Sequence, residues 1–510
     1  MPPKRRASVR IALVYPNAYA VGMASLGFQT VYRLFNEHQD LQCERVFVPA
    51  PPLERELRSL ESGEPLRAFS FIGVSIAYEP DLVTLVRLLS DAGIPPLASE
   101  RDDAHTLVFA GGVLGGLNPS PLLPFVDAVL AGEGEGVVPR IAEILVRIRS
   151  GPRCRRERLT ALGELDGVTI PNRRTQVVRQ AVEPLEAYPT YTPVVTPISH
   201  FENRFVVELS RGCARRCLFC AGGKVYHPLR FHSPDSVRRT VRDRNPGARR
   251  VGLEGASLSD YPGLEELGQS LIEVGHEISF SSVRVDRITP QFLGVLEKGN
   301  IRSFTVAPEA GSESLRARIR KEIPDAVLER STRLIAESPV EVLKLYFLIG
   351  LPGETDDDVS AMADLVRRMA GLFLTTSKRR IRLSVNAFVP KPFTEFQWAA
   401  MERPEALSRK RALLEKSLAD LRRVVALEKS GREETLQAIL AVGDERAGLA
   451  VHDRVVLNLP WKRAFEKNGV DPELLIHRSR SLGDALPWDF IQSGISKKTL
   501  WDRYQTAIRG

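Results

Sequence analysis

Cysteine is scarce in this chain of 510 residues, which contains only five, and histidine occurs eight times. So few thiols argue against a secreted protein that is stabilised by disulfide bonds, and they indicate a protein of a reducing compartment. No apolar run approaches the length needed to cross a bilayer. The basic residues 1–6 are not followed by the apolar segment and small-residue cleavage site of a secretory signal. We therefore expect a cytoplasmic protein without membrane contact.

The composition and charge that are present suit a large globular protein. Hydrophobic residues make up 43% of the chain, which at this length predicts two or three folded domains. The formal net charge of +8 would suit a polyanionic partner such as RNA. Because the basic residues are spread over the chain, solvated helix faces explain most of them. Nucleic acid is therefore an alternative partner here rather than an expected one.

The first third of the chain alternates short apolar runs with amphipathic stretches of helical spacing. This alternation predicts an open parallel sheet with helices on both faces, a Rossmann-like domain over residues 1–150. Ligands of such sheets bind at the carboxyl ends of the strands. Residues 151–195 are rich in Arg and Pro and are predicted as a connector with a small hairpin.

A second strand–helix series starts at Phe205 and contains six expected strands, the last over residues 381–389. Six such units predict a partial, open (β/α)6 TIM-like barrel over residues 196–400, with its site at the C-terminal ends of the strands. Residues 401–510 are more highly charged and predict a mostly helical region. The expected fold class is therefore α/β.

A cysteine array directly follows the first barrel strand. The segment RGCARRCLFC spaces Cys213, Cys217 and Cys220 as C-x3-C-x2-C. Three thiolates on a short loop can bind three irons of a [4Fe–4S] cluster and leave the fourth iron open. A zinc site is the alternative, because His227 or His232 would complete a Cys3His set.

The array matches the cluster loop of radical S-adenosylmethionine enzymes. The segments APEAGSESLR, KLYFLIGLPGETDDDV and NAFVPKPFTEFQW resemble a group of bacterial Fe–S oxidoreductase proteins with a cobalamin-binding-like N-terminal domain. The resemblance covers nearly the whole chain. It implies that the open iron holds S-adenosylmethionine, which the reduced cluster cleaves to a 5′-deoxyadenosyl radical. It also implies an electron donor such as a flavodoxin or ferredoxin.

The resemblance further implies S-adenosylmethionine contacts after four barrel strands. A polar side chain and backbone would hold the methionine end, a carboxylate would sit at the barrel mouth, and a cation on the following helix would pair with the cofactor's carboxylate. A Gly-Pro-Gly turn would let backbone approach adenine. Turns and ordinary ion pairs are the structural alternatives. The implied contacts are Glu254, Gly255, Arg284, Glu309, Lys321, Gly350, Pro352 and Gly353, with Lys391 as a further candidate after the sixth strand.

The N-terminal domain resembles the cobalamin-binding fold of many radical S-adenosylmethionine methyltransferases. Ser75, Gly111 and Gly112 fall where that fold uses a small hydroxyl and a glycine pair. The D-x-H-x-x-G loop that carries its cobalt-ligating histidine is missing, because the corresponding loop reads PNAYAVGMASLG. Cobalamin is therefore a candidate cofactor, and a relic domain that serves as scaffold or lid is the alternative.

These features predict a radical S-adenosylmethionine enzyme that modifies an unactivated C–H position, with cobalamin-dependent methyl transfer as one outcome. A methylthiotransferase would carry three further cysteines in the N-terminal domain, which has only Cys43. The alternative from another class is a non-catalytic or assembly protein that binds an Fe–S cluster and RNA. Small molecules, RNA and proteins all remain open as substrates, and no catalytic residue is assigned.

Overall fold

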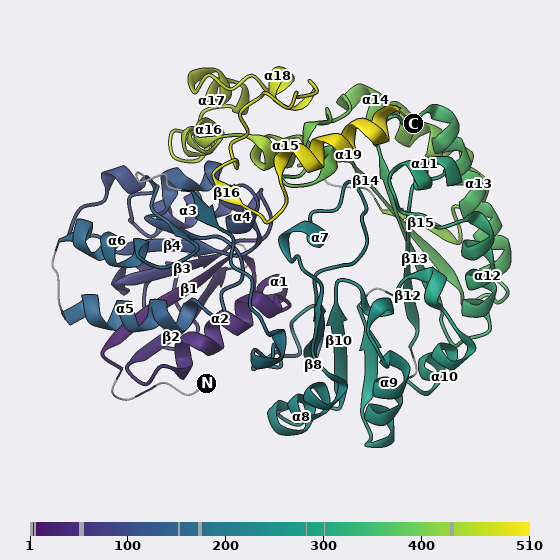
Figure 1. Ribbon diagram of the computed structural model, residues 1–510, viewed down its shortest axis with the longest axis horizontal. Helices are drawn as coiled ribbons and strands as arrows, with labels where there is room; N and C mark the ends of the chain where they lie inside the picture. Colours follow the sequence, from purple (N-terminus) through teal and green to yellow (C-terminus); the bar gives the residue numbers. More distant parts are fainter. Residues whose placement is uncertain are drawn as a thin grey trace. The chain divides into compact units, whose positions relative to one another are not determined.

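The computed structural model describes Lys4 and residues 7–49, 56–150, 154–171, 176–281, 283–299, 301–428 and 433–509. These residues form two compact units, drawn in Figure 1. The first contains residues 1–204, 436–475 and 484–495, and the second contains residues 205–435, 476–483 and 496–510. Residues 401–510, expected as one helical region, are thus divided between the two units. None of the helices that the structure describes is long and apolar enough to span a membrane.

The first unit contains the predicted open sheet. Its strand order is β2-β1-β3-β4-β5-β6, and all pairings are parallel except that of the last strand. The short apolar runs expected from the sequence are present as strands, and most are apolar on both faces, whereas β2 also contains the buried polar residues Gln42 and Glu44. The strands are β1 Val9–Ala18, β2 Leu41–Val48, β3 Phe71–Ser75, β4 Leu107–Gly111, β5 Ala128–Leu130 and β6 Val168–Thr169.

Helices cover both faces of this sheet. One face packs against α2 and α5, which also touch each other, and the other packs against α3. The C-terminal segment returns to this unit, where α16 lies against α3. The helices are α1 Tyr19–Gly22, α2 Leu26–Glu37, α3 Asp81–Asp91, α4 Val113–Gly116, α5 Val138–Ser150, α6 Arg155–Gly163, α15 Glu434–Val442, α16 Glu445–Val455, α17 Trp461–Lys467 and α18 Pro472–Ile476. The connector contributes β7 Val177–Val178, which pairs with β16 Ile491–Gln492.

The second unit contains the six expected barrel strands, arranged as two four-stranded sheets with the orders β11-β10-β8-β9 and β12-β13-β14-β15. Within the described ranges no pairing joins β11 to β12, so the barrel is open, as predicted. The strands are β8 Arg204–Arg211, β9 Arg230–Phe231, β10 Arg250–Gly255, β11 Glu277–Phe280, β12 Ser303–Glu309, β13 Val342–Ile349, β14 Arg380–Ala387 and β15 Val425–Glu428. The third expected strand, 278–285, is shorter than predicted, and its residue 282 lies outside the described residues.

Helices α10, α12 and α13 lie on the outer side of the second sheet (Figure 1). The outward residues of β13 and β14 form the apolar layer beneath them, with Leu343, Leu345 and Ile381 fully buried. The helices of this unit are α7 Gly222–Val225, α8 Pro234–Arg244, α9 Leu264–Glu273, α10 Pro290–Lys298, α11 Glu313–Arg318, α12 Asp325–Ala336, α13 Asp356–Phe373, α14 Pro404–Ser417 and α19 Lys497–Arg509.

Candidate functional site

The three cysteines lie on the loop that follows β8, at the carboxyl end of that strand, and all three thiols are half-buried. Leu218, at the centre of this loop, is fully buried. Its backbone N–H donates to the carbonyl of Ile319 at 3.1 Å, and its carbonyl accepts from the N–H of Phe396 at 3.1 Å. Because the loop is held at its centre from both sides, the thiols are presented in a defined arrangement.

The surroundings of Cys217 bring several predicted site residues together. Burial raises the pKa of the Cys217 thiol to about 11, Lys321 opposes that rise, and Cys220, Glu309 and Cys213 add to it. The two other cysteines and a carboxylate–ammonium pair therefore surround this thiol. Metal ligation deprotonates a coordinating thiol, so iron bound by this group of thiols would have to overcome the raised pKa of Cys217.

Neither histidine of the zinc alternative joins the cysteines in a metal-binding group among the described residues. In the described part of the chain, no three Cys, His, Asp or Glu side chains converge to coordinate one metal ion. His232 is buried beside Glu208, with Nε2 3.9 Å from the carboxylate, and His227 is exposed. Thiols spread along a loop suit a [4Fe–4S] cluster, which binds each of them through a different iron.

Glu309 and Lys321 form a buried ion pair at the end of β12. Lys321 Nζ lies 3.1 Å from Glu309 Oε1, and the two side chains are 13% and 17% exposed. Glu309 has φ of 71°, a left-handed conformation that is uncommon away from glycine and clusters at functional sites. Lys321 was predicted on a helix, and this is wrong: it lies in the turn between α11 and α12. Arg320 and Glu322, on either side of Lys321, have positive φ of 56° and 50°, which a right-handed helix cannot contain.

Arg284 lies near the cysteine loop, and its guanidinium is already paired. Its Nε and Nη2 donate to the carboxylate of Asp286 at 2.9 and 3.0 Å. Burial opposes the shift, but Asp286 raises the pKa of Arg284, with smaller contributions from Cys217 and Asp260. The structure therefore contains the ordinary ion pair named as the alternative, and the implied contact of Arg284 with S-adenosylmethionine stays a prediction.

Glu254 and Gly255 end β10 next to β8. A side chain at Gly255 would place its Cβ 2.5 Å from the hydroxyl oxygen of Ser210, so β10 can pass this close to β8 only with glycine there. Burial raises the pKa of Glu254 to about 7, and the neighbouring Glu208 adds to that rise. Burial disfavours the ionised form of this carboxylate, so a bound cationic group would stabilise it.

A buried ionic group on β8 is a part of the site region that the sequence analysis missed. Arg211 Nη2 lies 2.7 Å from Glu208 Oε2. Burial opposes the shift, but Arg211 and His232 lower the pKa of Glu208 to about 2. A glutamate within the otherwise apolar run FVVEL was the available signal, since a charge inside such a strand requires a partner.

The loop after β13 contains the predicted Gly350, Pro352 and Gly353, and both glycines have positive φ, of 76° and 79°. Glu354 does not begin the following helix, because Thr355 is its N-cap. Its carboxylate turns back and accepts from the N–H of Gly350 at 2.6 Å. The side chain of Glu354 is 1% exposed and pairs with Lys410 of α14 at 2.9 Å. The loop is therefore held in shape by a helix that lies far along the sequence.

A second distant element supports the cysteine loop. Lys224, in the short helix α7 after the loop, lies 2.8 Å from the fully buried carboxylate of Glu395. Arg503 of the C-terminal helix α19 approaches the same oxygen at 3.4 Å. The rings of Trp398 and Trp501 meet edge to face at 5.2 Å, so α19 also packs against the segment that contains Glu395. Lys391 lies beyond the end of β14 and is itself half-buried, in an otherwise buried loop that leads to Glu395.

In the first unit, Ser75 and Gly111 are paired at the carboxyl ends of β3 and β4. Gly112 has φ of 97°, and a Cβ there would lie 2.6 Å from the carbonyl oxygen of Ile76. The chain's own backbone thus accounts for glycine at position 112. Ser75 stays half-buried and Gly112 exposed.

The segment after β4 is held by the part of the chain that returns to this unit near the C-terminus. The amide of Asn118 donates to the carbonyl of Ala441 at 3.1 Å and to that of Gly443 at 2.8 Å. The hydroxyl of Ser120 donates to the carbonyl of Pro487 at 2.8 Å. The side chains of Asn118 and Ser120 are therefore already hydrogen-bonded within the protein. The segment PNAYAVGMASLG also contains no histidine. Nothing described in this unit requires a corrinoid.

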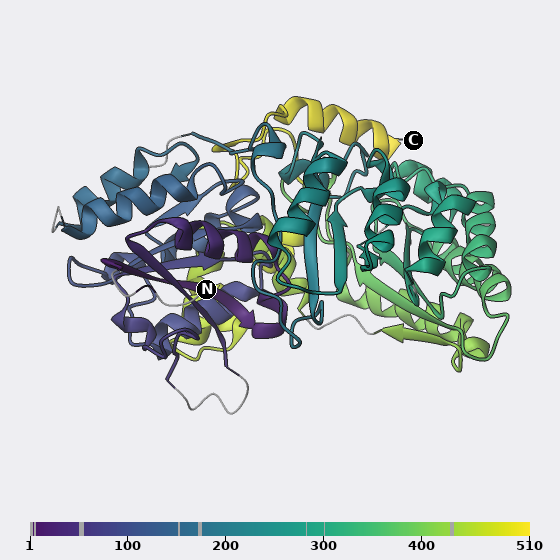
Figure 2. The same cartoon turned by 90° about the horizontal axis from the view of Figure 1, so that it is seen from below.

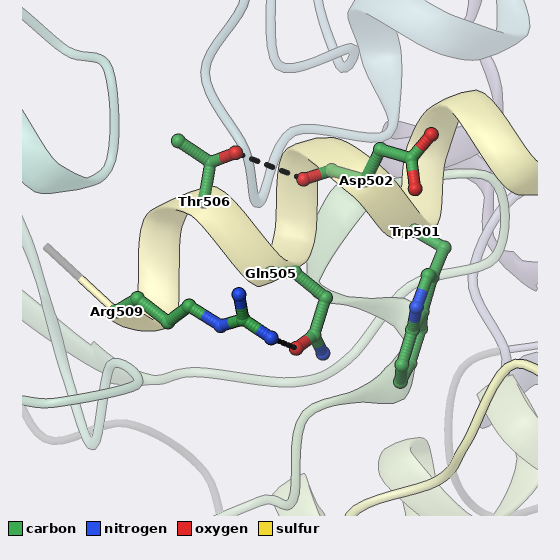
Figure 3. A pocket seen from close by; sticks show the side chains of 5 residues that line it. All are labelled: Trp501, Asp502, Gln505, Thr506 and Arg509. Carbon is green, nitrogen blue, oxygen red and sulfur yellow. Dashed lines mark hydrogen bonds between the residues drawn. The ribbon is translucent and has the colours of Figure 1, made fainter.

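A hollow beside α19 is not a second site. It is lined by Trp501, Asp502, Gln505, Thr506 and Arg509, all from that one helix (Figure 3). The bonds drawn in Figure 3 run within the helix, from Thr506 to the Asp502 carbonyl and from Arg509 to Gln505. Among the described residues, no second element contributes a polar group to the hollow, so it has no means of orienting a ligand.

Two family models match the chain. A model described as the N-terminal part of radical SAM proteins matches residues 27–171, and one described as the radical SAM superfamily matches residues 207–366. The first match covers strands β2 to β6 of the open sheet but not β1, and the second contains the cysteine loop and the ends of β8, β10, β11, β12 and β13.

Individual relatives agree with these matches. An uncharacterized protein of Methanocaldococcus jannaschii is 27% identical, over 85% of this chain and 89% of its own. A tRNA-2-methylthio-N(6)-dimethylallyladenosine synthase of Anaeromyxobacter sp. (strain K) is 25% identical, over 66% of this chain and 68% of its own. The structure of the radical S-adenosylmethionine methyltransferase TsrM from Kitasatospora setae is similar in fold, with a TM-score of 0.50 at 13% identity, over 74% of this chain and 73% of its own.

Proposed function

Because the chain belongs to the radical S-adenosylmethionine superfamily, we propose that it is an enzyme that cleaves S-adenosylmethionine reductively and modifies an unactivated C–H position of its substrate. The observation that carries the proposal is the cysteine loop at the end of β8, whose Cys217 lies among two further thiols and the Glu309–Lys321 pair. Such a loop, at the carboxyl ends of barrel strands, is where the reactive groups of this fold gather.

In this proposal Cys213, Cys217 and Cys220 hold a [4Fe–4S] cluster. When bound, the cluster and S-adenosylmethionine supply a 5′-deoxyadenosyl radical, and the protein supplies position and shielding. Leu218 fixes the loop at its centre through its two backbone hydrogen bonds. The buried pair of Lys224 and Glu395 holds the helix that leaves the loop.

The residues around the loop are suited to the polar ends of S-adenosylmethionine. Glu254, a carboxylate with few neighbouring cations, is suited to an ammonium group. Lys321 is the cation placed to meet a carboxylate, and it would exchange part of its contact with Glu309 for it. The loop of Gly350, Pro352 and Gly353 is held by Glu354 and Lys410 and offers backbone to a flat ring.

Cobalamin-dependent methyl transfer is the second candidate. The pairing of Ser75 with Gly111 at the carboxyl edge of the first sheet favours it. The glycine at 112 and the polar loops nearby are accounted for by the chain's own backbone, so no step is assigned to a corrinoid here. A non-catalytic protein that holds the cluster and RNA is the alternative from another class.

The test is reductive cleavage of S-adenosylmethionine. The protein is purified without oxygen, its iron and sulfide are reconstituted, and 5′-deoxyadenosine is measured after reduction with dithionite. We expect 5′-deoxyadenosine from the wild-type chain and none from C213A/C217A/C220A, with C154A as a cysteine control at the N-cap of α6. A reconstituted, reducible cluster that yields no 5′-deoxyadenosine would refute the enzymatic proposal and favour the non-catalytic alternative.

A further inference from the structure

The sheet of β12–β15 has one apolar and one polar face. The residues of β13 and β14 that point toward the outer helices are buried, as Leu343, Leu345 and Leu383 show with no exposed surface. The alternate residues form the opposite face. They include Lys344, Tyr346, Arg382, Ser384 and Asn386, and Arg382 and Asn386 are exposed.

Cations gather on this face and at the start of its strands. Lys344 and Arg382 are directly paired across β13 and β14, an arrangement in which like charges are destabilising. β15 lies beside β14 at the edge of this sheet, visible in lime green in Figure 2. The segments that enter β14 and β15 add further exposed cations. We call the set the β13–β15 cationic surface: Lys344, Lys378, Arg380, Arg382, Arg422 and Arg423.

These cations lack acidic partners within the described part of the chain, since no ion pair joins any of them to Asp or Glu. The acids that flank them in sequence are engaged elsewhere: Asp420 with Arg367 at 3.1 Å and Glu341 with Arg302 at 3.3 Å. The arginine-rich helix α8 differs, because Arg238 pairs with Asp235 at 2.6 Å and Arg242 with Asp243 at 2.7 Å. Repulsion between the cations of the β13–β15 surface is therefore not offset by neighbouring acids, whereas Arg238 and Arg242 of α8 are paired with acids of the same helix.

We propose that the β13–β15 cationic surface binds a single-stranded segment of RNA and docks it to the barrel. A row of cations that follows a phosphodiester backbone, next to an exposed aromatic ring on which a base stacks, is the recognition pattern of single-stranded nucleic acid. Tyr346 supplies that ring, with 37% of its surface exposed. From the register, Arg380 and Tyr346 are separated by roughly 13 Å along the strands, which is more than one phosphate group spans. The role as a substrate-docking surface rests on the proposed function, whereas RNA binding itself does not.

The test measures the affinity of the full-length, cluster-reconstituted protein for a fluorescently labelled oligouridylate, over a series of salt concentrations. The surface variant is R382E/R422E/R423E. The matched control is R239E/R242E/R244E on α8, which makes the same change in charge at exposed arginines. All six positions are exposed, and iron content with circular dichroism checks that both variants fold.

We expect the surface variant to bind at least about tenfold more weakly. The slope of log affinity against log salt concentration should also fall by about two, because each of the three lost phosphate contacts to a single strand contributes about 0.7. The α8 variant should match the wild type, and Y346A should weaken binding with the salt slope unchanged. Equal losses in both charge variants would overturn the proposal, because attraction would then follow net charge alone. Binding of polyglutamate but not of oligouridylate would overturn it in favour of an acidic protein partner.

Failure of this inference and failure of the proposed enzyme are separable. Formation of 5′-deoxyadenosine without RNA, together with no binding of oligouridylate, would remove the docking surface and leave the enzyme. Binding of oligouridylate lost only in R382E/R422E/R423E, together with no 5′-deoxyadenosine, would leave the surface and remove the enzyme.

Discussion

The carboxylate of Glu395 lies 2.8 Å from the ammonium of Lys224, and the two side chains are 0% and 7% exposed. The contact joins the helix after the cysteine loop to the segment after β14, which are distant in sequence. The N–H of Phe396, the next residue, is bonded to Leu218 within the loop. The shape of the cysteine loop therefore depends on a buried ion pair that the loop itself does not contain.

We expect E395Q to lose the cluster more readily than the wild type. The substitution removes the carboxylate that neutralises the buried charge of Lys224, which costs about 3–5 kcal/mol. The measurement is the rate at which iron is lost to a chelator, together with the free energy of unfolding. R503Q is the control and should cost less than about 1 kcal/mol, because Arg503 is 32% exposed and lies at 3.4 Å. Equal iron retention in E395Q and wild type would contradict the supporting role of the pair.

Single replacement of Cys213, Cys217 or Cys220 by alanine should abolish cluster binding while the barrel still folds. Each thiol is half-buried on a loop outside the strands, so alanine creates no cavity in the core. Iron content and the visible absorption of the reconstituted protein are the measurements. C154A should retain full iron. A single variant that kept both its iron and 5′-deoxyadenosine formation would exclude that thiol as a ligand.

The affinity for S-adenosylmethionine should fall as the pH is lowered through about 7. Burial raises the pKa of Glu254 to about 7, so below that pH the carboxyl group is neutral in the free protein and no longer attracts an ammonium group. Binding then requires release of a proton, and the dissociation constant rises by up to about tenfold per pH unit. Equilibrium dialysis one unit below and one unit above that pH tests this. E254Q should bind weakly and with little pH dependence, and a slope identical to that of the wild type would contradict the assignment.

The raised pKa of Glu254 also affects the stability of the ligand-free protein, which should fall as the pH rises, whereas the affinity for S-adenosylmethionine falls as the pH is lowered. In the unfolded chain Glu254 ionises near its ordinary pKa, and in the folded chain only near 7. Its contribution to stability is therefore complete below the ordinary pKa and is lost as the pH rises through about 7. Ligand-free wild type should lose stability relative to E254Q over that interval.

Replacement of Lys321 by methionine should weaken S-adenosylmethionine binding and leave the cluster intact. Methionine retains the length and apolar stem of lysine but removes the charge, and Glu309 is left buried without its partner. We expect a loss of affinity of about tenfold or more with unchanged iron content. K467M, which removes an ion pair to Asp453 at 3.0 Å, is the control with no effect on affinity. Unchanged affinity in K321M would show that the pair is structural only.

The sequence predicted the strands and the cysteine loop well, because both are local patterns. The runs IALVY and FIGVSI are apolar on both faces, which only a buried parallel strand requires, and they became β1 and β3. The C-x3-C-x2-C spacing needs no tertiary context to be recognised. Lys321 was misplaced because the left-handed residues on either side of it, Arg320 and Glu322, are not ones that usually adopt that conformation.

The supports of the site could not be predicted in the same way. Lys224 and Glu395 are separated by 171 positions, and Glu354 and Lys410 by 56. Each looks like an ordinary surface charge when it is considered alone, and only the fold shows that it is buried and paired. The division of residues 401–510 between two units was hidden for the same reason, since the helical spacing of a segment does not specify what it packs against.

We expect the protein, when purified without oxygen from cells supplied with cobalamin, to contain cluster iron but corrinoid well below one per chain. The backbone of Ile76 accounts for glycine at position 112, and the C-terminal segment takes the hydrogen bonds of Asn118. A corrinoid would therefore have to bind at this edge without the loop histidine and beside groups already satisfied. The optical spectrum measured beside the iron content decides the question. Near-stoichiometric corrinoid would contradict this expectation and make methyl transfer the leading reaction, whereas iron alone would favour hydrogen abstraction without methyl transfer.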